Sequence, residues 1–137
     1  MIAYKVVGKK TRLSSNFTIF QNDKGSKKLE KLLENKEIAK FCKKYEPGKI
    51  VRAVRGSVGI LCFSDMDSAE VFISRQVKPK NFKVIQVSGN KRRLIKGFSL
   101  INNCGGLPER LTHINIRNAE MRPPWGTIAF PQVKVLD

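Results

Sequence analysis

The sequence predicts an α+β domain that spans residues 1–137 as a single unit, with a mostly antiparallel sheet and two or three short helices. Two observations carry this prediction. Short runs rich in β-branched and aromatic residues recur along the chain, and their order lacks the regular strand-helix alternation of a doubly wound parallel sheet. With 137 residues and a hydrophobic fraction of 41%, the chain is long enough to bury the core of one such domain.

Two strands and two helices are expected in the N-terminal third. "MIAYKVV" (1–7) and "SNFTIF" (15–20) are typical of strands, and a basic loop joins them. Ser26 can cap a helix over 27–34. The apolar residues that follow "ENKE" lie about half a turn round from those before it, so one straight helix would expose one of the two stripes. We therefore expect a break at "ENKE" and a second helix over 36–44.

The middle of the chain is its least charged part and is expected to form the core. Strands over 50–54 and 57–63 are linked by a tight turn at 55–56, and the second is nearly all apolar, which favours a central position. Ser64 opens a predicted helix over 64–75. The residues expected to include much of the core are Ile60, Leu61, Phe63, Phe72, Val84 and Val87.

A β-hairpin is predicted around "VSGNKRRLIKGF", with arms over 82–88 and 93–101. Gly89 and Asn90 tolerate a positive φ, which a tight hairpin turn requires. Further along, two short strands flank Pro131, which marks an edge or a bulge because proline has no N–H to donate.

The charge of the chain indicates an anionic partner. There are 27 Lys and Arg against 11 Asp and Glu, a formal net charge of +16. These excess cations repel one another unless counterions or an anionic ligand relieve them. Nucleic acid, either DNA or RNA, is the leading expectation for that ligand, and an acidic protein is the alternative.

The candidate nucleic-acid-binding residues form two groups. Those of the predicted hairpin are Lys91, Arg92, Arg93 and Lys96. Those on the predicted lysine-rich helices are Lys27, Lys28, Lys31, Lys43 and Lys44. Contacts of such side chains with phosphate supply affinity without sequence specificity. Trp125 and Phe98 could stack on unpaired bases, but packing in the core or in a turn is the expected use of both.

Catalytic, metal-binding and cofactor-binding signals are weak, and we predict no catalytic residues, no metal and no cofactor. His113 is the only histidine, and a cleft that brought it together with Glu109 and Glu120 would be needed to support an enzyme. The glycines do not have the spacing of phosphate-wrapping loops.

The three cysteines are far apart and show no metal-ligand spacing. We expect reduced thiols, with Cys62 buried and Cys104 the more exposed. No stretch approaches the length of a membrane span, and the N-terminal apolar run is too short for a signal peptide. A cytoplasmic protein is therefore expected.

The segment "YEPGKIVRAVRGSVGILCFSDMDSAEVF" resembles small uncharacterised microbial or viral α+β domains. More distantly, its Gly-Ile-x-x-Phe run followed by a helix is similar to a strand-then-helix segment of ADP-ribosyltransferase folds. That resemblance implies a fold and, as a further alternative, a small transferase-like enzyme. The transferase pattern also has an N-terminal His or Arg and a Glu on a late strand, and this sequence has neither.

Overall fold

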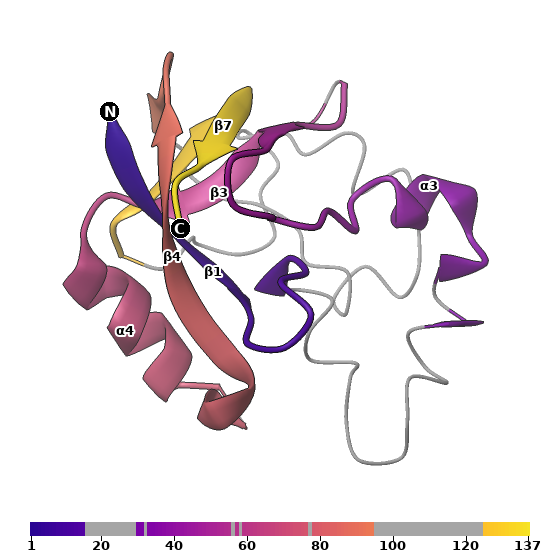
Figure 1. The fold of residues 1–137 in the computed structure, drawn as a ribbon, viewed down its shortest axis with the longest axis horizontal. Coiled ribbons are helices and arrows are strands. Elements are labelled where there is room, and N and C mark those ends of the chain that lie inside the picture. Colours follow the sequence, from indigo (N-terminus) through magenta and orange to yellow (C-terminus); the bar gives the residue numbers. More distant parts are fainter. Residues whose placement is uncertain (16–29, 32, 56, 58, 77, 95–124) are drawn as a thin grey trace.

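Seven strands form one sheet in the computed structural model, which describes residues 1–137 except 16–29, 32, 56, 58, 77 and 95–124. Every strand pair among the described residues is antiparallel, and the order is β2-β7-β4-β1-β3-β6-β5. Figure 1 shows part of this sheet, with β1, β3, β4 and β7 labelled. The strands are β1 (Ile2–Gly8), β2 (Ile50–Arg52), β3 (Ile60–Phe63), β4 (Phe82–Gly89), β5 (Arg93–Leu94), β6 (Thr127–Phe130) and β7 (Gln132–Val135). The predicted α+β class with an antiparallel sheet is confirmed.

The helices that lie wholly within the described residues are α3 (Lys36–Ala39) and α4 (Met66–Ser74), and a 3-10 turn, η1, covers Pro79–Asn81. Among the described residues, α4 is the only helix longer than about one turn, so the predicted count of two or three helices is unsupported. The helix predicted over 36–44 is too long, because α3 ends at Ala39. Half of the predicted helix over 27–34, namely 27–29 and 32, lies outside the described residues, while residues 30, 31 and 33 are helical as expected. Nearly all of the strand predicted over 15–20 also lies outside the described residues.

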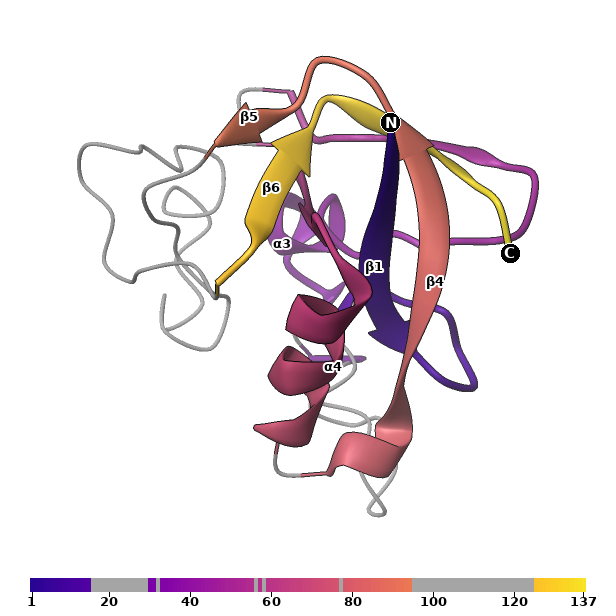
Figure 2. The same ribbon diagram turned by 90° about the vertical axis from the view of Figure 1, so that its left-hand side faces the viewer.

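The sheet curls round and closes on itself, because β6 and β7 form one bent strand that pairs with both halves of the sheet. Only Pro131 separates β6 from β7, and proline cannot donate the hydrogen bond that a continuous ladder requires. On one side of this break β6 pairs with β3, and on the other β7 pairs with β4. Since β1 joins β3 to β4, these strands close into a small barrel-like layer (Figure 2).

Two apolar clusters hold this layer together. The cluster inside the curled sheet is built from Ala3, Val7, Tyr45, Val51, Ile60, Cys62, Ile85, Val87, Ile128, Phe130, Val133 and Val135. The cluster between α4 and the sheet is built from Val6, Phe63, Ala69 and Phe82, with Tyr4, Phe72, Ile73 and Val84 packed against it. Strand β1 serves both clusters because successive side chains of a strand point to opposite faces.

The core prediction is largely confirmed. Ile60, Phe63 and Val87 are buried, and the half-buried Phe72 and Val84 pack against the cluster between α4 and the sheet. Leu61, which was also expected in the core, is only half-buried. As expected for the most apolar predicted strand, β3 lies between β1 and β6 and so is central in the sheet.

Two local predictions need correction, and one of them only in part. The helix α4 is capped by Asp65 instead of Ser64, because the Asp65 carboxylate accepts a hydrogen bond of 2.7 Å from the backbone N–H of Ser68. A tight turn does follow β2, where the backbone N–H of Ser57 donates to the carbonyl of Val54. The strands on either side of that turn do not pair with each other, since β2 pairs with β7 and β3 pairs with β1 and β6.

The predicted hairpin at residues 82–101 is wrong over its described part. Strand β4 does not pair with β5, because β4 lies between β1 and β7 while β5 pairs with β6. The positive φ falls on Lys91, at 59°, and not on Gly89 or Asn90. Gly89 is required for a different reason. A Cβ atom there would lie 2.5 Å from the Phe130 ring.

Candidate nucleic-acid interface

The described cations of the predicted hairpin lie at a break between two long bent strands. Gly89 is opposite Val133, and Arg93, four residues after Gly89, is opposite Ala129, four residues before Val133. The register is therefore the same on both sides of the break, and β5 continues β4 along the edge of the C-terminal strand. This register places Lys91 opposite Pro131, where neither residue continues the ladder.

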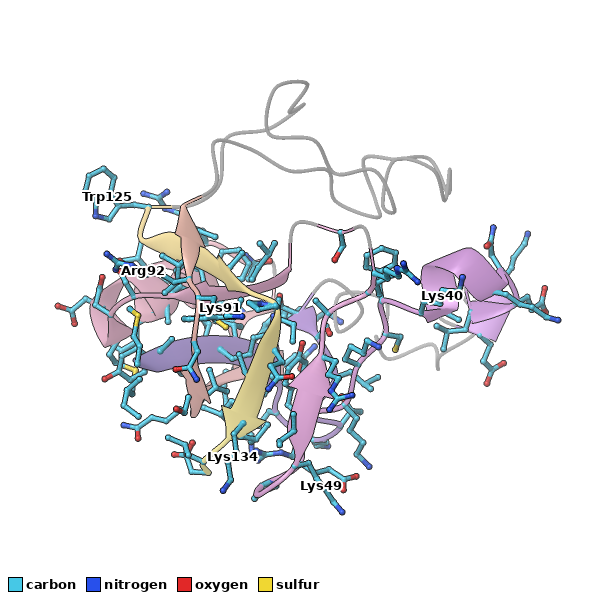
Figure 3. All side chains as sticks on the ribbon, turned by 90° about the horizontal axis from the view of Figure 1, so that it is seen from above. Lys40, Lys49, Lys91, Arg92, Trp125 and Lys134 are labelled. Carbon is cyan, nitrogen blue, oxygen red and sulfur yellow. The ribbon has the colours of Figure 1, made fainter. Side chains whose placement is uncertain are left out.

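Lys91 and Arg92 are exposed at this break. The left-handed backbone of Lys91 and the missing N–H of Pro131 interrupt the ladder on both strands at the same level. Both cationic side chains therefore extend from the rim of the sheet, and not from the tip of a separate hairpin (Figure 3).

Three further cations lie on or next to β2 and β7. Lys134 is exposed between the buried Val133 and Val135, because side chains alternate along β7. Arg52 is exposed and lies opposite Gln132. The carbonyl of Lys49 accepts a hydrogen bond of 2.9 Å from the N–H of Val135, which fixes Lys49 beside the end of β7.

We call these five exposed cations the basic row; its members are Lys49, Arg52, Lys91, Arg92 and Lys134. Figure 3 shows Lys49, Lys134, Lys91 and Arg92 in succession across one side of the molecule. Lys91 is opposite Pro131, three residues from Lys134, so the two lysines are offset by about 10 Å along the strand direction. The five cations thus form one extended surface over adjacent strands.

None of the five side chains of the basic row forms a hydrogen bond or ion pair in the part of the chain that the structure describes. Several described acidic groups lie elsewhere, with Asp65, Asp67 and Glu70 at α4. Glu46, which is close to Lys49 in sequence, pairs with Lys44 at 3.3 Å. Asp137, which follows β7, accepts a hydrogen bond from the backbone N–H of Gln86, so no described acidic side chain forms an ion pair with the basic row.

Trp125 stands at the start of β6 with 89% of its surface exposed. The expectation that it packs in the core or in a turn is therefore wrong. Its neighbour Gly126 has a φ of +80° and lies so close to α4 that a Cβ atom there would be 2.6 Å from Ser68 Oγ. The N–H of Ser64 also donates to the Gly126 carbonyl at 2.9 Å. The backbone beside Trp125 is thus held while its indole ring faces solvent.

The structure separates the residues that the sequence grouped as binding candidates. Arg93 is placed through its backbone in β5, whereas Lys96, Lys27, Lys28 and Phe98 lie outside the described residues. Lys31 is exposed, Lys44 is paired with Glu46, and the half-buried Lys43 accepts a hydrogen bond at its carbonyl from Ser14. Lys40, which follows the end of α3, lies apart from the basic row in Figure 3.

Sequence reasoning missed three members of the basic row, namely Lys49, Arg52 and Lys134. The alternation of polar and apolar residues in "QVKV" could have placed Lys134 on an outer face. No signal in the sequence could have placed Lys134 near Lys91, because that proximity depends on the pairing of β4 with β7.

A sixth cation, Lys5, is buried inside the curled sheet and takes no part in the basic row. Its Nζ donates a hydrogen bond of 2.7 Å to the carbonyl of Leu61 and lies 5.2 Å from the centre of the Tyr45 ring. Burial lowers the pKa of the Lys5 amine, against a smaller opposing effect of Cys62. Burial also raises the pKa of the Cys62 thiol to about 11, although Lys5 acts to lower it.

No cluster of three or more His, Cys, Asp or Glu side chains that could hold a metal ion is present among the described residues. His113, Glu109, Glu120 and Cys104 fall outside them, so the structure does not test a cleft at those positions. No helix in the described part of the chain is long and apolar enough to cross a membrane.

Comparison with family models, with curated proteins and with solved structures finds no match to this chain.

Proposed function

We propose that this protein binds nucleic acid through phosphate contacts made by the basic row. The observation that carries this proposal is the set of five exposed cations, without partners among the described residues, on adjacent strands of one sheet. Two of them, Arg52 and Arg92, carry guanidinium groups that can contact two phosphate oxygens at once. The proposed partner is DNA or RNA, bound with little preference for base sequence because phosphates carry no sequence information.

The proposal places this binding in the cytoplasm, since the free thiols of Cys42 and Cys62 fit a reducing compartment. The net charge of +16 supports the proposal in a second way, because a strongly positive protein attracts polyanions at long range.

Salt dependence of binding tests the proposal directly. Binding of a random-sequence duplex would be measured over a range of salt concentrations for the wild type and for the double variant Lys91→Ala/Lys134→Ala. Each duplex phosphate neutralised contributes about −0.9 to the slope of log K against log salt. If each lysine neutralises one phosphate, the variant should flatten the slope by about 1.8.

A matched control is available at the other end of β4. Lys9 and Lys80 are exposed, and the N–H of Lys9 donates to the carbonyl of Asn81 at 2.8 Å, so both lie near η1. The variant Lys9→Ala/Lys80→Ala removes the same charge and should leave the slope nearly unchanged. Equal flattening by both variants would mean that net charge, and not the basic row, governs binding.

An acidic protein is the alternative partner, and a competitor separates the two readings. Polyglutamate should displace the duplex poorly if the basic row recognises phosphate. Displacement at the same concentration of charge would overturn the proposal and favour an acidic protein partner.

A further inference from the structure

We infer, on the basis of the proposed nucleic-acid binding, that the bound strand is single and that Trp125 stacks on one of its bases. Cations alone do not distinguish a duplex from a single strand, because both present phosphates. An aromatic ring does distinguish them, since the faces of bases inside a duplex are already covered by their neighbours. A protein that combines a basic surface with an exposed aromatic ring has the two features used for single strands.

The exposure of Trp125 is the first observation that supports this inference. A tryptophan in a folded protein usually buries a large apolar area, yet Trp125 leaves 89% of its surface in solvent. Its backbone is nevertheless fixed, because Gly126 packs closely against Ser68 and bonds to Ser64. An exposed ring on a held backbone can accept a base at a lower ordering cost than a ring on a mobile chain.

The position of Trp125 relative to the basic row is the second observation. Trp125 precedes Phe130 by five residues, with Trp125 and Gly126 in a turn and Thr127–Phe130 in β6, and by register Phe130 lies opposite Arg92. Five residues of chain span at most about 17 Å. Figure 3 shows Trp125 beyond Arg92 at one end of the row, with Lys49 at the other. A strand whose phosphates follow the row would therefore present a base near the indole.

The intrinsic fluorescence of the protein reports on this contact, because Trp125 is the only tryptophan in the chain. We would titrate the wild type with oligothymidylate and oligouridylate of about 16 nucleotides, the upper end of the site size of small single-strand-binding barrels. An abasic oligomer of the same length and a hairpin duplex serve as comparisons. Quenching is expected with the two base-bearing single strands and not with the abasic oligomer.

The variant Trp125→Ala should bind oligothymidylate about 5- to 150-fold more weakly, the effect of losing one stacked base. Its affinity for the duplex and for the abasic oligomer should not change, and Trp125→Phe should recover part of the loss. Leu136→Ala is the matched control, because it also removes an exposed apolar side chain, 42% exposed, from the end of β7. That control should leave the affinity for every probe unchanged.

The outcomes separate this inference from the proposed function. If Trp125→Ala binds all probes like the wild type while Lys91→Ala/Lys134→Ala flattens the salt slope, the single-strand inference is wrong and phosphate binding stands. Weakened duplex binding by Trp125→Ala would also overturn it, in favour of an apolar wedge in a duplex groove. If no probe binds the wild type at low salt, both proposals are wrong.

Discussion

Substitution of Gly89 by alanine should strongly destabilise the protein, because the new methyl group would collide with Phe130. A Cβ atom at position 89 would lie 2.5, 2.7 and 2.9 Å from three carbons of the Phe130 ring. That ring has 0% exposed surface and cannot move aside without displacing its neighbours. Overpacking of this kind costs about 1–3 kcal/mol and sometimes more. We expect a loss near the upper end, about 3 kcal/mol, in the free energy of unfolding.

The unfolding free energy would be measured by urea denaturation with far-ultraviolet circular dichroism, because the exposed Trp125 is a poor reporter of core packing. The double variant Gly89→Ala/Phe130→Leu removes the ring that the methyl group meets. Its cost should be smaller than the sum of the two single costs, with a coupling of about 0.5–3 kcal/mol.

Gly48→Ala is the control for glycine replacement as such, since no atom lies within 4 Å of its Cβ position and only its φ of +80° opposes the change. Phe130→Leu should leave the Gly48→Ala cost unchanged. A Gly89→Ala protein within about 0.5 kcal/mol of the wild type would refute the reasoning, because surface-like tolerance is incompatible with a ring packed on Gly89. The closure of β4 against the C-terminal strand would then be wrong.

Three further predictions concern ionisable groups. Burial lowers the pKa of Lys5, so the unfolded chain holds this proton at pH values where the folded chain has released it. The free energy of unfolding of the wild type relative to Lys5→Met should therefore rise with pH up to the ordinary pKa value of 10.5. A difference between the two proteins that stays constant with pH in urea denaturation would contradict this. In a Cys104→Ser background, a thiol reagent should modify the half-buried Cys42 before the buried Cys62, and the reverse order by mass spectrometry would count against the placement of β3 in the core. The hydrogen bond from the backbone N–H of Ser68 lowers the pKa of Asp65, so the contribution of the Asp65 carboxylate to stability should be present above the ordinary pKa value of 3.8 and lost as the pH falls through the lower folded value. Asp65→Ala should remove that pH dependence, while Asp65→Asn should retain the cap. Identical melting temperatures of the two variants would argue against capping.

The parts of the fold that could be predicted from sequence are those that depend on local patterns. The apolar run in "GILCF" identified β3 and its central place, and Ala69 with Phe72 identified the buried face of α4. These patterns report directly on which side chains avoid water. The α+β class follows from them without knowledge of strand pairing.

The partner of each strand could not be predicted, because the decisive contacts join distant residues. Gly89 and Asn90 have the composition of a hairpin turn, but Gly89 is needed where the Phe130 ring packs against β4. The same limit applies to the candidate site. Lys91 and Arg92 were found as a local cluster, whereas Lys134 joins them only through the register between β4 and β7.

The bent C-terminal strand also decides when this protein can fold during its synthesis. Strands β6 and β7 are translated after every strand with which they pair, namely β2, β3, β4 and β5. Until they leave the ribosome, β3 and β4 each have an edge without a partner among the described strands, and an open edge is a template for association with other chains. Their pairing with β2 and β3 also spans a long stretch of sequence, which slows folding. We therefore expect chains that stop before Thr127 to aggregate, and nascent chains to depend on chaperones until the last strand emerges.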